Sequence, residues 1–274
     1  MTNSVCGRLD QDFHHVPVIL IICPFDSNIH LEELCTCQKS SRPSAKRHPC
    51  EREILSREIV SDGMTFQLTI ECTNDMGSDR AIENLFTSRI PPDCQAVGIT
   101  LGHHLVTGKH MPAVNLALLS IARRIGLELE ATGIVWQPAK LHVDFAHFSE
   151  AVEQYAEHHI FPTIVQIALR SPGNGRLETR GLTYFVGREV RTLFSAQQNT
   201  RAWMSHFLKI TGALISGRRL TNETAILSNA PNNAQLTSYR RDGSVLEFSY
   251  AEPIPAGIAV TASQAALGAA SRTF

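Results

Sequence analysis

Two histidines and an aspartate near the middle of the chain have the spacing of a metal site. His142, Asp144 and His147 place two imidazoles and one carboxylate within six residues. If this segment turns, all three could reach one ion, and hydrolytic enzymes use such ligands to make a bound water acidic. A structural interpretation is simpler. Asp144 would cap the helix that follows it, and Phe145 and Phe148 would form the buried face of that helix.

A second set of potential metal ligands lies near the amino terminus. Cys35, Cys37, His48 and Cys50 supply thiol and imidazole groups within sixteen residues, and zinc binds both. The C-x-C spacing differs from the C-x2-C pairs of common zinc motifs, which favours free thiols in an extension. All seven cysteines lie before residue 95, and an odd number confined to one end does not suit a disulfide framework. No cofactor is predicted, and zinc is the metal that these patterns would suit.

The segment Gly102–His110 carries three histidines and a lysine between an expected strand and an expected helix. Ligand-binding loops often occupy this position in layered folds, but a surface loop is the favoured interpretation. The spacing is not that of a phosphate-binding P-loop. The sequence also lacks the G-x-S-x-G, G-x-G-x-x-G and H-E-x-x-H motifs. Whether the protein is an enzyme therefore stays open.

The stretch T-R-G-L-T-Y-F-V-G-R-E supplies a further candidate site. Its alternating side chains predict a strand over residues 179–194. Arg180 and Glu189 would flank this strand, either as a structural ion pair or as part of a ligand-binding site. The second interpretation requires that both residues converge with Trp136 and His142 in one concave pocket.

This stretch resembles the T-x-G-L-x-x-F-G-x-x-E signature of a bacterial family known as a domain of unknown function. The matching residues are Thr179, Gly181, Leu182, Phe185 and Glu189. The second glycine, Gly187, is displaced by one position. An aromatic strand and turn at Gly133–His142, the helix that carries Trp203 and the closing hairpin also fit. The resemblance covers about residues 64–250, implies a single α+β domain and brings no established activity.

The apolar pattern predicts a fold of the α+β class. Residues 64–72 alternate as a half-buried strand, and Pro112 opens a helix whose apolar side chains recur at helical spacing. Another apolar strand is expected at 161–169. Two strands around Asp242 and Gly243 predict a closing antiparallel hairpin. We expect one mixed β-sheet with helices packed on it.

Composition divides the chain into three parts. Residues 1–60 are expected to form an amino-terminal extension rich in cysteine and basic residues, disordered or loop-like at 26–50 and helical at 51–60. Residues 61–251 are expected to form a single α+β domain. Residues 252–274, which are rich in Ala, Pro, Ser and Gly, are expected to form a flexible tail.

Charge and hydropathy narrow the class of partner. The formal net charge is −1, and the basic stretch at 39–57 has little aromatic content, so nucleic acid is not expected as a partner. No apolar run reaches the ~18–20 residues of a membrane span. The apolar run at 16–25 lacks both a positive leader and a small-residue cleavage site. We therefore interpret it as a buried strand and expect a cytoplasmic protein.

The sequence is compatible with two functions. The first is a non-catalytic bacterial protein that binds another protein, as an interaction or accessory module. The absence of catalytic motifs favours it. The alternative is a metal-dependent hydrolase or metal-binding protein that uses His142, Asp144 and His147.

Overall fold

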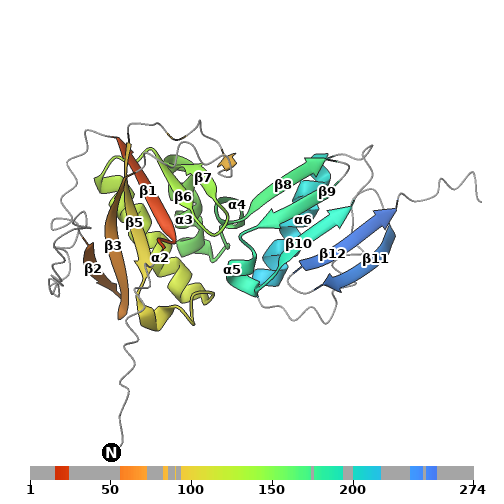
Figure 1. Cartoon of the computed structure of the whole chain (residues 1–274), viewed down its shortest axis with the longest axis horizontal. Coiled ribbons are helices and arrows are strands. Elements are labelled where there is room, and N and C mark those ends of the chain that lie inside the picture. The colour runs from red at the N-terminus through yellow and green to blue at the C-terminus, as the bar shows by residue number, and fades with distance from the viewer. Residues whose placement is uncertain are drawn as a thin grey trace, which may run out of the picture. The chain divides into compact units, whose positions relative to one another are not determined.

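The computed structural model describes residues 16–24, 56–72, 83–85, 90, 94–173, 176–193, 200–216, 235–242 and 245–251. The chain divides into two compact units, whose elements are labelled in Figure 1. The first unit is formed mainly by residues up to Ser149. The second is formed by residues from Glu150 onward, together with Ala81–Leu85 and Pro138–Leu141.

Seven strands of the described residues form the first sheet, in the order β2-β3-β5-β1-β6-β7-β4. They are β1 (Ile19–Pro24), β2 (Ser56–Ser61), β3 (Met64–Cys72), β4 (Glu83–Leu85), β5 (Cys94–Leu101), β6 (Gly133–Trp136) and β7 (Leu141–Asp144). β1 lies between β5 and β6 and is antiparallel to both. Because it is central, Ile19–Cys23 is buried at every position, which explains its continuous apolar run.

Helix α2 (Pro112–Glu128) packs against β1, β3 and β5. It begins at Pro112 as predicted, since the fixed φ of proline suits the first turn and its missing N–H costs nothing there. Gly126 lies inside this helix, where the ring of Phe145 occupies the space that a side chain would need. A short 3-10 turn, η2 (His103–Leu105), precedes α2. Helix α3 (Phe145–His158) follows β7 directly.

Five strands of the described residues form the second sheet, in the order β11-β12-β10-β9-β8. They are β8 (Ala168–Gly173), β9 (Arg176–Arg180), β10 (Glu189–Leu193), β11 (Gln235–Asp242) and β12 (Val245–Ala251). β10 and β12 are parallel and the other neighbours are antiparallel, so the sheet is mixed. The predicted closing hairpin is confirmed as β11 and β12.

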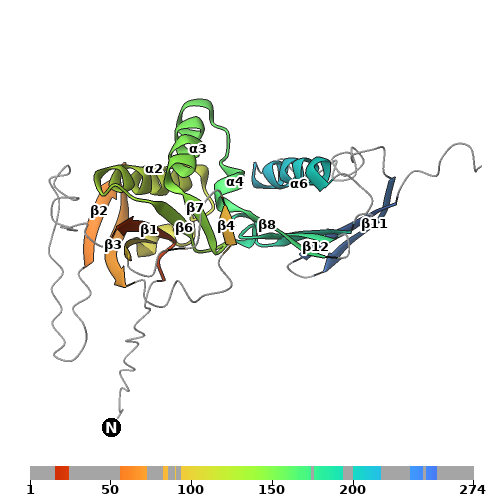
Figure 2. The same cartoon turned by 90° about the horizontal axis from the view of Figure 1, so that it is seen from above.

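Helix α6 (Thr200–Ile215) lies along one face of the second sheet (Figure 2). Three large side chains of this helix are almost fully buried: Trp203, Phe207 and Ile210. The ring of Phe207 lies 6.0 Å from that of Phe248 on β12. Two shorter helices, α4 (Thr163–Gln166) and α5 (Thr183–Val186), also contact α6. No helix among the described residues is long and apolar enough to cross a membrane.

The α+β class is confirmed, but the described residues form two sheets in two units where the sequence predicted one domain over 61–251. The amino-terminal boundary also differs. β1 and β2 are strands of the first sheet, although residues 1–60 were expected to be an extension with a helix at 51–60. Pairing with β3 along all six residues of β2 outweighs the weak helical pattern of that segment. The expected tail at 252–274 lies outside the described residues.

Two expected strands are interrupted by helices. The strand expected at 161–169 is instead α4 followed by the start of β8. The strand expected over 179–194 is β9, α5 and β10 in succession. Gly181 and Gly187 have φ angles of 96° and 73°, in the left-handed region that ends a strand or a helix.

Candidate functional site

The 179–189 stretch folds around the carboxylate of Glu189. Its Oε1 accepts hydrogen bonds from the backbone N–H groups of Gly181 and Thr183, each at 3.0 Å. Its Oε2 accepts one from the N–H of Leu182 at 3.2 Å and one from the hydroxyl of Thr179 at 2.7 Å. One side chain at the start of β10 thus satisfies three amides at the turn into α5.

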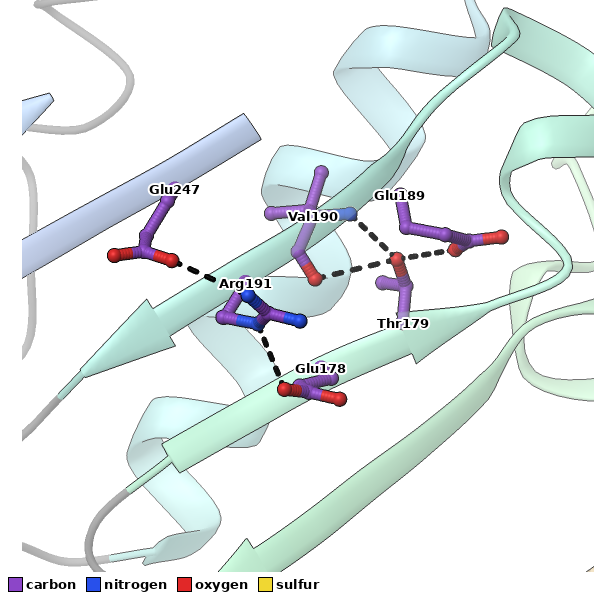
Figure 3. A network of polar contacts seen from close by, with 6 residues as sticks. All are labelled: Glu178, Thr179, Glu189, Val190, Arg191 and Glu247. Atoms are coloured by element: carbon purple, nitrogen blue, oxygen red, sulfur yellow. Dashed lines mark hydrogen bonds and ion pairs between the residues drawn. The ribbon is translucent and has the colours of Figure 1, made fainter. Parts of the chain in front are cut away.

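Thr179 connects this carboxylate to the next strand (Figure 3). Its Oγ1 donates to Glu189 and accepts a 2.8 Å hydrogen bond from the N–H of Val190. The side chain is only 5% exposed, so these bonds are made away from solvent. We call Thr179, Glu189 and the amides of residues 181–183 the Thr179–Glu189 network. It joins β9, α5 and β10.

Gly181 lets the chain make this turn. An ideal Cβ at this position would lie 2.7 Å from the Cβ of Ala139 and 3.0 Å from the carbonyl oxygen of Gln166. Leu182 and Phe185 follow with 0% and 7% exposure, and both belong to the core of the second unit. The residues that carry the family resemblance therefore all have structural roles here.

Arg191 forms the second polar group of this region (Figure 3). Its Nε lies 2.7 Å from Oε1 of Glu178 on β9, and its Nη1 lies 3.4 Å from Oε2 of Glu247 on β12. Burial disfavours the charge on Arg191, but the two carboxylates outweigh this effect and raise the pKa of the guanidinium. The strand register extends this row to Arg170 on β8. Charges of alternating sign therefore run across β12, β10, β9 and β8.

The proposed metal ligands of the first unit are placed differently from the expectation. Asp144 caps α3, because its Oδ1 accepts from the N–H groups of Ala146 and His147 at 3.0 and 3.2 Å. The same oxygen lies 3.0 Å from Nδ1 of His147. Burial opposes ionisation of Asp144, but these hydrogen bonds hold its pKa below the usual value.

His142 does not complete a metal site with these two residues. It is 2% exposed on β7, and its ring packs where Gly133 leaves space on β6. Within the described residues, no group of three or more His, Cys, Asp or Glu side chains is placed to hold a metal ion. The metal interpretation of His142, Asp144 and His147 therefore gains no support and stays a prediction, whereas the structure shows the capping of α3 by Asp144.

The four expected ligand-binding residues divide between the two units. Trp136 and His142 are buried in the first, whereas Arg180 and Glu189 belong to the second. Glu189 uses both carboxylate oxygens within its own fold. A shared pocket for the four thus remains a prediction.

The remaining chemical candidates fall into three groups. In the 102–110 segment, His103, His104 and His110 are exposed around η2. Cys23 is buried, and its burial, with a smaller effect of Cys94, raises the pKa of the thiol to about 12, which disfavours the reactive thiolate form. The amino-terminal set, Cys35, Cys37, His48 and Cys50, lies outside the described residues.

The structure adds a surface that the sequence analysis missed, in the turn between α3 and α4. The N–H of His159 donates to the carbonyl oxygen of Tyr155, and its φ of 57° turns the chain out of α3. Phe161 then packs between two rings, 5.7 Å from that of Tyr155 and 5.1 Å from that of Phe185. On either side of this anchor, Ile160 and Ile164 are 60% and 43% exposed.

Sequence offered one signal for this surface. Residues 159–164 read H-I-F-P-T-I, and the proline argues against the continuous strand that the apolar residues predicted. In place of that strand the chain forms α4, and Ile160 and Ile164 are exposed. We call Ile160 and Ile164, with their anchor Phe161, the Ile160–Ile164 surface.

Comparisons of the chain with protein-family models, with curated proteins and with solved structures find no match. The resemblance to the domain-of-unknown-function family therefore stays a prediction. A function can therefore be proposed only from the residues of this chain.

Proposed function

We propose that this protein acts by binding another protein, and that the Ile160–Ile164 surface is the contact. The observation that supports this proposal is the exposure of two isoleucines on a segment held in place by aromatic packing. Single exposed apolar residues are common on protein surfaces. Two of them on either side of Phe161, whose ring packs against Tyr155 and Phe185, form a preorganised apolar surface, and such surfaces lose little conformational entropy when they bind.

The other candidate sites give less support to catalysis. The carboxylate of Glu189 is used by the turn into α5, and Asp144 is used by the start of α3. A metal-dependent hydrolase would need a set of ligands around one ion. The His142, Asp144 and His147 set does not supply one in the described structure. Protein binding is the function that the exposed residues support best.

Quantitative affinity capture tests this proposal. The full chain with an affinity tag is expressed in the cells that naturally make it, and co-purified proteins are quantified by mass spectrometry. The Ile160→Ser/Ile164→Ser variant should lose at least one partner that the wild type retains. The matched control is Leu127→Ser, which removes an aliphatic side chain that is 55% exposed on α2. Equal partner sets for wild type and the double variant would refute the proposal.

A further inference from the structure

Helix α6 buries an imidazole on the side through which it packs. His206 is only 7% exposed. Its ring centroid lies 5.8 Å from that of Trp203, one turn earlier on the helix, and the two rings are nearly perpendicular. Trp203 has no exposed surface, and Phe207, which follows His206, lies near Phe248 of the second sheet. An ionisable group is thus placed within the apolar packing of the second unit.

The elements packed with α6 present no free carboxylate to His206 within the described residues. The sheet side chains on the face of Phe248 are apolar or threonine: Leu177, Thr179, Val190, Thr192, Leu246 and Phe248 itself. α4 contains no ionisable residue, and in α5 burial raises the pKa of the Tyr184 hydroxyl, so that this phenol is neutral. Glu189 follows α5, but both of its oxygens already accept hydrogen bonds at the turn.

The remaining charges near His206 belong to α6 itself, and they are positive. Lys209 lies one turn after His206 and is exposed, and Arg201 lies more than one turn before it. Burial and, to a smaller extent, Lys209 lower the pKa of His206 below its usual value of 6.5. A pKa that is lower in the folded than in the unfolded state stabilises the fold above about pH 6.5. This contribution is lost as the pH falls through the folded-state pKa.

We propose that His206 makes the packing of α6 sensitive to protons. The neutral imidazole lets the helix lie on the second sheet, and uptake of a proton from solvent in mild acid releases the helix. A buried positive charge is costly unless an opposite charge balances it, whereas a helix that moves off the sheet keeps its own hydrogen bonds. Trp203 would move with His206, so that a fully buried indole would meet water. The inference is independent of the Ile160–Ile164 surface.

Acrylamide quenching of Trp203 fluorescence tests the proposal. The full chain carries Trp136→Phe, which leaves Trp203 as its single tryptophan. From about pH 7.5 to about pH 5.5 we expect the Stern–Volmer quenching constant to rise at least about twofold, because α6 opens. The unfolding equilibrium constant in urea should rise by up to about tenfold for each pH unit below about 6.5, which is the limit for one proton.

Two variants remove the proton site, and a third serves as the control. His206→Phe and His206→Gln cannot be protonated at this position, so the quenching and unfolding constants of each should stay nearly the same over this pH range. Two replacements are used because either one alone could impair folding. His158→Gln removes an exposed histidine of the same unit and should keep the pH dependence of the wild type.

Two results would overturn the proposal. One is the same pH dependence of quenching and unfolding in the wild type and in the His206 variants. The other is a fall of Trp203 emission in acid without any gain in acrylamide access. In that case the imidazolium would quench the neighbouring indole while α6 stays packed.

Discussion

Glu189 shows how one carboxylate can organise a turn. It accepts hydrogen bonds from the hydroxyl of Thr179 and from three consecutive backbone amides, residues 181–183. Those amides would otherwise lack partners at the start of α5, where a helix leaves its first N–H groups unsatisfied. A negative charge is also favoured at this end of a helix. The network therefore fixes the path of the chain between β9 and β10.

Replacing Glu189 should destabilise the second unit. Glu189→Gln keeps the shape of the side chain but turns an NH2 group toward amide donors, which should cost about 2–3 kcal/mol. Trp136 and Trp203 are the only tryptophans, so in a Trp136→Phe background urea unfolding followed by fluorescence reports on Trp203 of the second unit. Glu157→Gln, an exposed change in the same unit, is the control. A cost for Glu189→Gln no larger than that of the control would contradict the role of the network.

Gly181 and Gly187 offer a matched pair of substitutions. Both have positive φ, so alanine is strained at either position by about 1 kcal/mol. At Gly187 an added Cβ would meet nothing within 4 Å, whereas at Gly181 it would lie 2.7 Å from Ala139. We expect Gly181→Ala to reduce the free energy of unfolding by at least about 1 kcal/mol more than Gly187→Ala. Equal losses in the same fluorescence assay would show that the Ala139 contact yields without cost.

Strands and helices with a single strong periodic signal were predictable from the sequence. β3, α2, α6 and the β11–β12 hairpin lie where alternation, helical spacing and the Asp242-Gly243 turn placed them. The structure of the 179–194 stretch was not predictable, because its residues alternate as in one strand although the chain turns between β9 and β10. Its fold depends on hydrogen bonds between Glu189 and amides six to eight residues away, and residue patterns do not encode such contacts.

In the candidate sites, too, local interactions were predictable from the sequence and contacts between distant residues were not. Capping of α3 by Asp144 is a local interaction, and the sequence predicted it as the alternative to metal binding. Pro162 indicated that the expected strand at 161–169 is interrupted, but it did not predict the exposure of Ile160. This exposure depends on the packing of Phe161 against Phe185, which lies 24 residues further along the chain by number (185 − 161).

The row of charged side chains on the second sheet contributes to the stability of that sheet through the ion pairs of Arg191. Arg191→Gln should lower the free energy of unfolding by about 0.5–1 kcal/mol, since its two ion pairs are partly exposed. The same assay on Trp203, run at low and at high salt, measures this loss. Salt screens partly exposed pairs, so the difference from wild type should shrink at 1 M NaCl. The exposed Arg176→Gln on β9 serves as the control. A loss that does not change with salt would mean that Arg191 acts through packing instead.

At the scale of the whole chain, the amino-terminal strands belong to the first unit. β1 pairs with β5 on one side and β6 on the other, and Ile19, Ile21 and Ile22 have no exposed surface. A central strand cannot be removed from a sheet without exposing the apolar surface of both neighbours. The segment is therefore part of the fold.

Removal of residues 1–63 tests this assignment. A chain that starts at Met64 lacks β1 and β2, and we expect its first unit not to fold. Trp136 lies on β6, so in a Trp203→Phe background its fluorescence should show no cooperative unfolding in urea. A cooperative transition like that of the full chain would contradict the central position of β1. Because a chain without residues 1–63 is not expected to fold, zinc binding by the amino-terminal set of Cys35, Cys37, His48 and Cys50 should be tested on the full chain. The comparison is the Cys35→Ser/Cys37→Ser variant of that full chain.

The central claim is that the Ile160–Ile164 surface contacts another protein, and photo-crosslinking in living cells tests it most directly. The full chain carries p-benzoyl-phenylalanine at position 160, or at position 127 of α2 as the control, in the cells that naturally make the protein. We expect a discrete crosslinked species from position 160 that the control lacks. If position 160 gives no product beyond that of position 127, the proposed function is contradicted.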